Sequence, residues 1–273
     1  MMESKFRTAY ILSIAILILM VAVSVGGLLI PDLYQDNAHV TAAWFGNDLA
    51  TLLVASPLLA LSIVLSSRGS LRWRLVWLGM LDYALYNTAY YLFGTAFNSF
   101  FLLYVVLFVL AMMALIFALA KLEVDEIGRR FRAGIPARWI AGFMVFVAVG
   151  LTVVYTIESL RFVFTGQIPQ IVTLTGKATS IVFALDLTLV VPWFILGAIW
   201  LWQRKPWGYV ITAITNVKGA VYMLALSAAT VSAAVRMAAP EDLGQVGLWA
   251  FIGVGNLIAA LLLLGRMHSA HQE

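Results

Sequence analysis

The chain has 273 residues, of which 63% are hydrophobic and only 11% are charged. This composition excludes an ordinary soluble domain, in which about 25% of residues are charged. The net charge of +4 does not indicate nucleic-acid binding, because the basic residues lie in short loops between apolar stretches. The absence of cysteine excludes disulfides, thiolate metal sites and dithiol redox chemistry.

Apolar stretches long enough to cross a ~30 Å hydrocarbon core as helices follow one another along the chain. We expect spans near residues 8–30, 47–66, 75–96, 99–120, 139–158, 179–202, 208–235 and 245–265. The first follows Lys5 and Arg7 and resembles a signal peptide, but its apolar run is too long, which predicts an uncleaved span. The predicted fold class is all-α, a polytopic transmembrane helical bundle of eight spans.

The loops predict the orientation of the bundle. With a cytoplasmic N-terminus, the outside segments carry only Arg161, Lys177 and Arg236. The inside segments carry Lys5, Arg7, Arg68, Arg72, Arg74, Lys121, Arg129, Arg130, Arg132, Arg138, Arg204, Lys205 and Arg266. Because positive charge favours cytoplasmic loops, both termini are predicted to be cytoplasmic. The linker 121–138 is predicted to form a short surface helix against anionic lipid headgroups.

Landmark spacing predicts an internal 4+4 parallel repeat, with halves at 1–120 and 139–273 joined by the linker 121–138. Pro57 precedes a basic turn that begins at Arg68, and Pro192 precedes one that begins at Arg204. Asp82 and Lys218 follow these arginines by the same number of residues. A proline inside a span interrupts its backbone hydrogen bonds, and simple packing kinks are the commoner result. Interrupted helices at matching positions of two halves also fit a transporter's binding site.

Several short runs carry a family resemblance: Gly46-Asn47-Asp48, Arg68-Gly69-Ser70-Leu71-Arg72, Tyr86-Asn87, Tyr90-Tyr91-Leu92-Phe93-Gly94, Phe97-Asn98 and Arg204-Lys205-Pro206-Trp207-Gly208. With these runs the chain resembles a group of uncharacterised bacterial multi-pass inner-membrane proteins of unknown function. The resemblance covers most of the chain and implies a bacterial cytoplasmic membrane. It implies no activity.

Lys218 is the leading candidate site residue, because it lies within an apolar span. A lysine at that depth costs several kcal/mol unless a carboxylate or a watery cavity accompanies it. Asp82 and Asp186 are its predicted partners, and which of them pairs with it stays open. Tyr86, Asn87 and Tyr222 are deep enough in their spans to need hydrogen-bond partners, so they are predicted to line a cavity with Lys218.

A second set of acidic residues belongs to the outer face: Asp32 in the first outside loop, Asp48 at the start of span two, and Glu158 at the end of span five. They predict an acidic vestibule that attracts cations, although Asp48 also fits a helix cap. A metal site from Asp32, Asp36, His39 and Asp48 matches no established spacing, so no metal and no cofactor are predicted.

Three functions fit these features. The first is a small-solute transporter or membrane ligand-binding protein, with a polar cavity between the halves in which Lys218 attracts an anionic group. The second is an intramembrane enzyme that acts on a lipid or isoprenoid through Asp48, Asp186 or Glu158. The third is a structural membrane protein with buried ion pairs. The expected partners are membrane lipids and an unknown small molecule, not nucleic acid.

Overall fold

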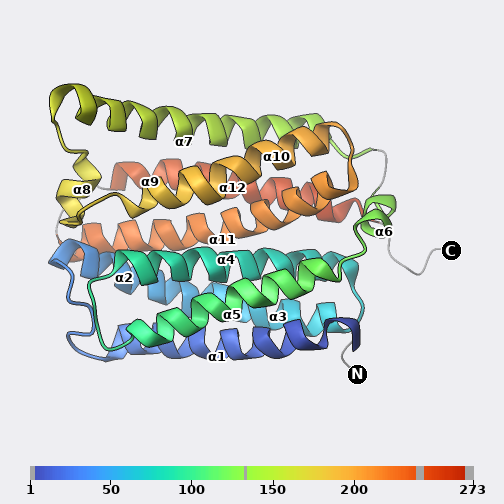
Figure 1. The fold of residues 1–273 in the computed structure, drawn as a ribbon, viewed down its shortest axis with the longest axis horizontal. Coiled ribbons are helices and arrows are strands. Elements are labelled where there is room, and N and C mark those ends of the chain that lie inside the picture. The colour runs from blue at the N-terminus through green and yellow to red at the C-terminus, as the bar shows by residue number, and fades with distance from the viewer. Residues whose placement is uncertain (1–3, 132–133, 238–242, 268–273) are drawn as a thin grey trace.

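The structure, a computed structural model, describes residues 4–131, 134–237 and 243–267, and Arg132 therefore lies outside the described residues. Within them the chain is helical and forms no β-strand (Figure 1). The elements are a 3₁₀ turn Ser4–Phe6, α1 Arg7–Leu29, α2 Ala38–Ala50, a π-helical turn Thr51–Ala55, α3 Ser56–Ser67, α4 Leu71–Gly94, α5 Phe101–Ala120, α6 Val124–Arg129, α7 Ala137–Thr165, α8 Gln170–Thr175, α9 Ile181–Leu185, a second π-helical turn Asp186–Val190, α10 Val191–Trp202, α11 Pro206–Arg236 and α12 Gly244–Gly265.

The architecture is that of a multi-pass membrane protein. In the described part of the chain, 7 helical stretches are long and apolar enough to span a membrane: Arg7–Leu29, Ala38–Ser67, Phe101–Ala120, Ala137–Thr165, Ile181–Trp202, Pro206–Arg236 and Gly244–Gly265. The remaining predicted span corresponds to α4, which Asp82, Asn87 and several tyrosines make more polar. Most of α4 is buried in the bundle, so these polar groups meet protein rather than the surroundings.

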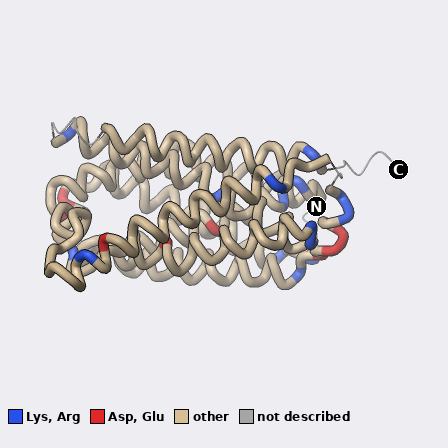
Figure 2. Tube along the Cα trace, turned by 90° about the horizontal axis from the view of Figure 1, so that it is seen from above, with Lys and Arg blue, Asp and Glu red and all other residues tan. Residues whose placement is uncertain are grey.

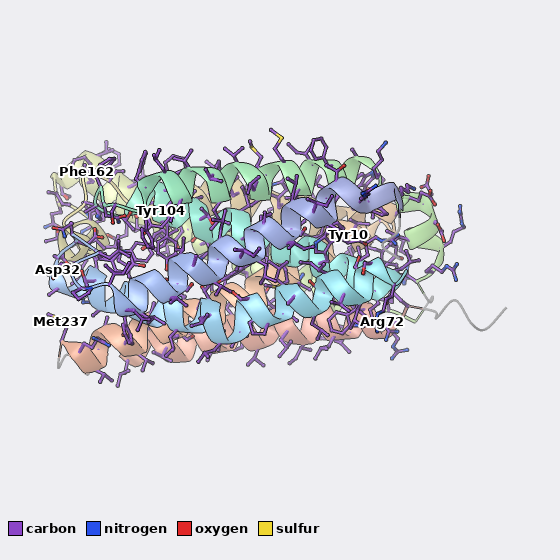
Figure 3. All side chains as sticks on the ribbon, turned by 90° about the horizontal axis from the view of Figure 1, so that it is seen from below. Tyr10, Asp32, Arg72, Tyr104, Phe162 and Met237 are labelled. Atoms are coloured by element: carbon purple, nitrogen blue, oxygen red, sulfur yellow. The ribbon has the colours of Figure 1, made fainter. Side chains whose placement is uncertain are left out.

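The helices lie lengthwise in one bundle, and α1 begins at the end where α12 finishes (Figure 1). Lysine and arginine are concentrated at that end, which we call the basic end (Figure 2). At the other end, the loop end, lie the 30–37 loop and the 166–180 segment that contains α8. Figure 3 places Asp32, Phe162 and Met237 at the loop end and Arg72 at the basic end.

Helices α4 and α11 form the centre of the bundle (Figure 1). They approach closely at Gly79, where an added Cβ would lie 2.6 Å from the Val217 Cβ and 3.1 Å from the Ile214 carbonyl oxygen. A glycine permits this contact because it has no side chain, as in other tightly packed membrane helices. Asp82 follows Gly79 by three residues and Lys218 directly follows Val217, so both candidate residues lie within one turn of this crossing.

Two of the bundle's helical stretches are interrupted in the same way. The π-helical turn Thr51–Ala55 ends two residues before Pro57, and the turn Asp186–Val190 ends two residues before Pro192. A proline lacks the N–H that an α-helix needs, so the preceding turn widens and the backbone pairs differently. The predicted interruptions are therefore present at both prolines.

The second helical stretch begins earlier than predicted. It starts at Ala38 rather than near residue 47, and its cap is Asn37, whose side-chain oxygen accepts a hydrogen bond from the Val40 N–H at 2.9 Å. The interpretation of Asp48 as a helix cap is therefore wrong. The polar residues Thr41 and Asn47 hid this start, because their side chains form hydrogen bonds within the protein.

Candidate functional site

Asp186 lies at the start of the second π-helical turn, about 8 Å along the axis from the beginning of α9. Its two carboxylate oxygens accept hydrogen bonds from the hydroxyls of Tyr86, at 2.5 Å, and Tyr155, at 2.8 Å. Tyr222 packs edge-on against Tyr86 with ring centroids 4.6 Å apart, and Phe183 stacks on Tyr155 at 4.2 Å. An aromatic shell from α4, α7, α9 and α11 thus surrounds one buried carboxylate.

Lys218 is buried beside this carboxylate, with 3% of its surface exposed. Its Nζ lies 4.4 Å from the centre of the Tyr86 ring, whose hydroxyl binds Asp186. Asp82 and Asp186 both interact electrostatically with Lys218. Among the described residues, no ion pair within 4.0 Å involves this ammonium. The burial of Lys218 is as predicted, whereas the expected direct ion pair is replaced by a cation–π contact.

We call Tyr86, Tyr155, Phe183, Asp186, Lys218 and Tyr222 the Asp186 site. Half-buried Asp82 precedes Tyr86 by four residues on α4, so both lie on one face of that helix. Asn87 belongs elsewhere, because its side-chain oxygen accepts a hydrogen bond from Asn47 at 3.2 Å. The structure therefore brings most of the predicted ligand-binding residues together and directs Asn87 toward α2.

Asp48 forms a second buried carboxylate cluster, which we call the Asp48 cluster: Tyr34, Asn47, Asp48 and Tyr91. Tyr34 and Tyr91 each donate a hydroxyl hydrogen bond of 2.6 Å to Asp48, and Asn47 donates one of 2.7 Å to the Tyr91 oxygen. Burial raises the pKa of Tyr34, so its hydroxyl stays protonated and donates. Asp48 is 0% exposed, and an added Cβ on Gly27 would lie 2.0 Å from its Oδ2.

A set of polar contacts joins the two loop-end segments. Asp36 accepts hydrogen bonds from the Trp44 indole N–H at 3.1 Å and from the Lys177 ammonium. Asn37 donates to the Leu174 carbonyl oxygen at 3.0 Å. We call Asp36, Asn37, Leu174 and Lys177 the loop latch, because these residues hold the 166–180 segment against the segment before α2.

A small cavity of about 20 Å³ lies under the loop latch. Trp44, Tyr90, Lys177 and Ile181 are among its lining residues. A space of this size holds about one water molecule. Tyr90 follows Tyr86 by four residues on α4, so the cavity and the Asp186 site lie along one face of that helix. The cavity therefore lies on the loop-end side of Asp186, and Asp186 is not among its lining residues.

The three residues predicted to form a vestibule have different surroundings. Asp32 is exposed in the 30–37 loop, Glu158 is half-buried on α7, and Asp48 is enclosed by its tyrosines. The acidic vestibule stays a prediction from the sequence.

The hydrogen-bond donors to the Asp48 and Asp186 carboxylates were not predicted from the sequence. Tyr155 and Tyr34 were not among the predicted site residues, and Phe183 carries no polar group that marks it. The signal that was available is a tyrosine hydroxyl inside an apolar helix, as at Tyr155, because such a hydroxyl requires an acceptor. The acceptor itself is set by how α7 packs against the α9–α10 stretch.

Comparison of the chain with protein-family models, with curated proteins and with solved structures finds no match in any of the three. The resemblance to a bacterial inner-membrane group, and the membrane that it implies, therefore stay predictions from the sequence.

Proposed function

We propose that the protein transports or binds a small polar solute at the Asp186 site. The observation that carries this proposal is the pair of interrupted helical stretches, each with a π-helical turn two residues before a proline and a buried aspartate beside it. Helices interrupted at corresponding positions of two halves are typical of transporter binding sites. The buried Lys218 next to Asp186 adds a second feature that is costly without a functional or structural role.

The proposal includes the topology predicted from the sequence. Helix α4 serves as an eighth span, residues 1–120 and 139–273 form a 4+4 repeat, and both termini lie in the cytoplasm of a bacterial cell. The basic end supports this orientation, because its loops carry most of the lysine and arginine residues (Figure 2). The close crossing of α4 and α11 at Gly79 supports a pseudo-two-fold axis between the halves.

Each residue has a defined task in this proposal. Asp186 accepts hydrogen bonds from the solute, and Tyr86 and Tyr155 hold its carboxylate in place. Lys218 offsets part of the charge of Asp82 and Asp186. The loop latch closes the route from the loop end.

A second candidate is a purely structural role, favoured by the fact that both oxygens of Asp48 and of Asp186 already have tyrosine partners. In that case the buried polar groups only orient the helices. The two candidates differ in one respect: a carrier opens its site to each end in turn, and a structural bundle does not.

Thiol labelling tests this difference, and the absence of native cysteine leaves no background. Single cysteines replace Tyr90, which lines the loop-end cavity, and Thr215, which is buried in α11 before Lys218. We expect slow labelling of Tyr90→Cys from the loop end and of Thr215→Cys from the basic end. Cross-linking two further cysteines placed at Asn37 and Leu174 should suppress the labelling of Tyr90→Cys and increase the labelling of Thr215→Cys. Unchanged protection of both positions after cross-linking contradicts the carrier and supports the structural role.

The topology has its own measurement. In intact cells, an impermeant thiol reagent should label Gln35→Cys and Thr175→Cys, whereas Glu126→Cys should react only after permeabilisation. Labelling of Glu126→Cys in intact cells contradicts the orientation.

A further inference from the structure

We infer that the solute taken by the Asp186 site is a small organic cation with an alkylammonium group. This inference rests on the proposed function and names the class of its substrate. It reverses the expectation that Lys218 attracts an anionic group. Charge, hydrogen-bond capacity and aromatic geometry lead to it.

The buried charges do not balance. Apart from Glu158 and Arg161 on α7 and the residues at the two ends of the bundle, the charged residues among those described are Asp48, Asp82, Asp186 and Lys218. Three carboxylates thus share one ammonium. An excess carboxylate in an apolar interior is stable only if it takes up a proton or binds a cation. A proton or a bound cation can offset this excess, whereas a negatively charged guest would add to it.

Asp186 is the carboxylate that can receive such a guest. Gly27 closes the Oδ2 side of Asp48, because a methyl group added to this glycine would overlap the carboxylate oxygen. Asp186 instead follows α9, whose residues Ile181 and Val182 line the loop-end cavity. Each Asp186 oxygen accepts one tyrosine hydrogen bond, and an ionised carboxylate has about four acceptor positions. Acceptor capacity therefore remains for an ammonium N–H.

The rings around Asp186 suit an alkylammonium group. Tyr86, Tyr155, Phe183 and Tyr222 come from four helices, and their π faces attract cations when water is excluded. Lys218 already demonstrates the contact, because its own alkylammonium lies 4.4 Å from the centre of the Tyr86 ring. A carboxylate inside an aromatic shell is the chemistry that recognises organic ammonium ions.

The test compares four solutes of similar size and different charge: ethylammonium, ethanol, acetate and glycine. The purified protein is titrated with each in detergent, and the thermal unfolding midpoint is followed by tryptophan fluorescence. A ligand that binds only the folded protein raises the midpoint as its concentration rises. We expect ethylammonium to raise it in a saturable manner, and the other three to raise it no more than a matched salt or osmolyte does.

Variants assign the effect to the site. Asp186→Asn should abolish saturable ethylammonium binding, and Tyr222→Leu should weaken it about tenfold. Tyr222→Phe keeps the ring and should bind nearly as well as the wild type, which keeps the test decisive if Asp186→Asn does not fold. Asp125→Asn, on α6 at the basic end, is the matched loss of a carboxylate and should leave the affinity unchanged. Equal ethylammonium binding by the wild type and Tyr222→Leu overturns the inference.

The outcomes separate this inference from the proposed function. If acetate or glycine binds in place of ethylammonium, the cation class is wrong, whereas solute binding at the site stands. If none of the four binds, the cation class is also wrong, and the thiol-labelling experiment decides independently whether the protein is a carrier.

Discussion

The Asp48 cluster and the Asp186 site are built on the same plan and differ in how tightly they are enclosed. Each holds an aspartate near a proline-associated π-helical turn, and each aspartate accepts two tyrosine hydroxyls. Asp48 is 0% exposed and Asp186 is 7% exposed. Only Asp186 has a lysine in its surroundings. The same polar motif can therefore hold helices together in one region and remain available for a ligand in another.

The helix that flanks each carboxylate explains the difference. In the first half, α1 packs along α5 and places Gly27 against Asp48. In the second half, α7 contacts α12 only over a short stretch that includes Phe143 against Gly255. Beyond that stretch, α7 exposes large apolar residues such as Val154, Val163 and Phe164. Because α7 is held by fewer neighbours, the Tyr155 side of the Asp186 site can move more easily.

Removing the carboxylates should produce the largest effect and tests this contrast. We expect Asp48→Ala to lower the free energy of unfolding by about 4 kcal/mol, because it strands two buried hydroxyls and leaves a cavity. Asp186→Ala should cost about 2 kcal/mol, because the less tightly held α7 can shift and let the freed Tyr155 hydroxyl find another partner. Denaturant unfolding in micelles measures both. Equal losses would show that the two carboxylates are enclosed to the same degree.

Two helical glycines sharpen the comparison. Gly27→Ala should destabilise the protein by about 3 kcal/mol, because its Cβ would lie 2.0 Å from the Asp48 Oδ2. Gly150 on α7 has no neighbouring heavy atom within 4 Å of an added Cβ, so Gly150→Ala should stabilise the helix by up to about 1 kcal/mol. Thermal unfolding midpoints of the two variants should move in opposite directions. A tolerated Gly27→Ala would mean that α1 does not seal the Asp48 cluster.

The loop latch should have a smaller, local effect. Lys177→Met removes a partly exposed partner of Asp36, so it should lower the free energy of unfolding by about 1 kcal/mol. Lys177→Arg keeps the positive charge and should retain most of this stabilisation. Hydrogen–deuterium exchange should accelerate in α8 and remain unchanged in α2, whose Trp44 still binds Asp36. Faster exchange in both helices would assign the latch a role in the Asp48 cluster as well.

The smallest effect concerns the basic end, at the contact between Lys5 and Glu123. The hydrogen bond from Lys5 lowers the pKa of Glu123 below its usual range. Because the pKa is lowered in the folded state, the contact stabilises the protein fully above the carboxyl's unfolded pKa, near 4.5. This stabilisation is lost as the pH falls through the lowered folded-state pKa. Glu123→Gln should therefore reduce the unfolding midpoint slightly at pH 7, with a smaller difference from the wild type at pH 3. A difference that grows on acidification contradicts this pairing.

The sequence by itself determined the membrane class and most helix positions, because crossing ~30 Å of hydrocarbon demands long apolar helices. It also identified the helix interruptions at Pro57 and Pro192 and the burial of Lys218, since a proline and an intramembrane charge act through their own chemistry. The polar helix α4 was recognisable by length, although its composition sets it apart from the seven apolar stretches.

Only the tertiary structure decided which groups satisfy the buried charges. Periodicity placed Tyr86 and Asn87 together, yet consecutive residues point to different sides of α4, so one binds Asp186 and the other Asn47. Tyr34 and Tyr155 became partners of the carboxylates through contacts between distant segments, which no local pattern records. The same packing set Lys218 against the Tyr86 ring instead of a carboxylate, because side-chain contacts depend on how helices pack against each other.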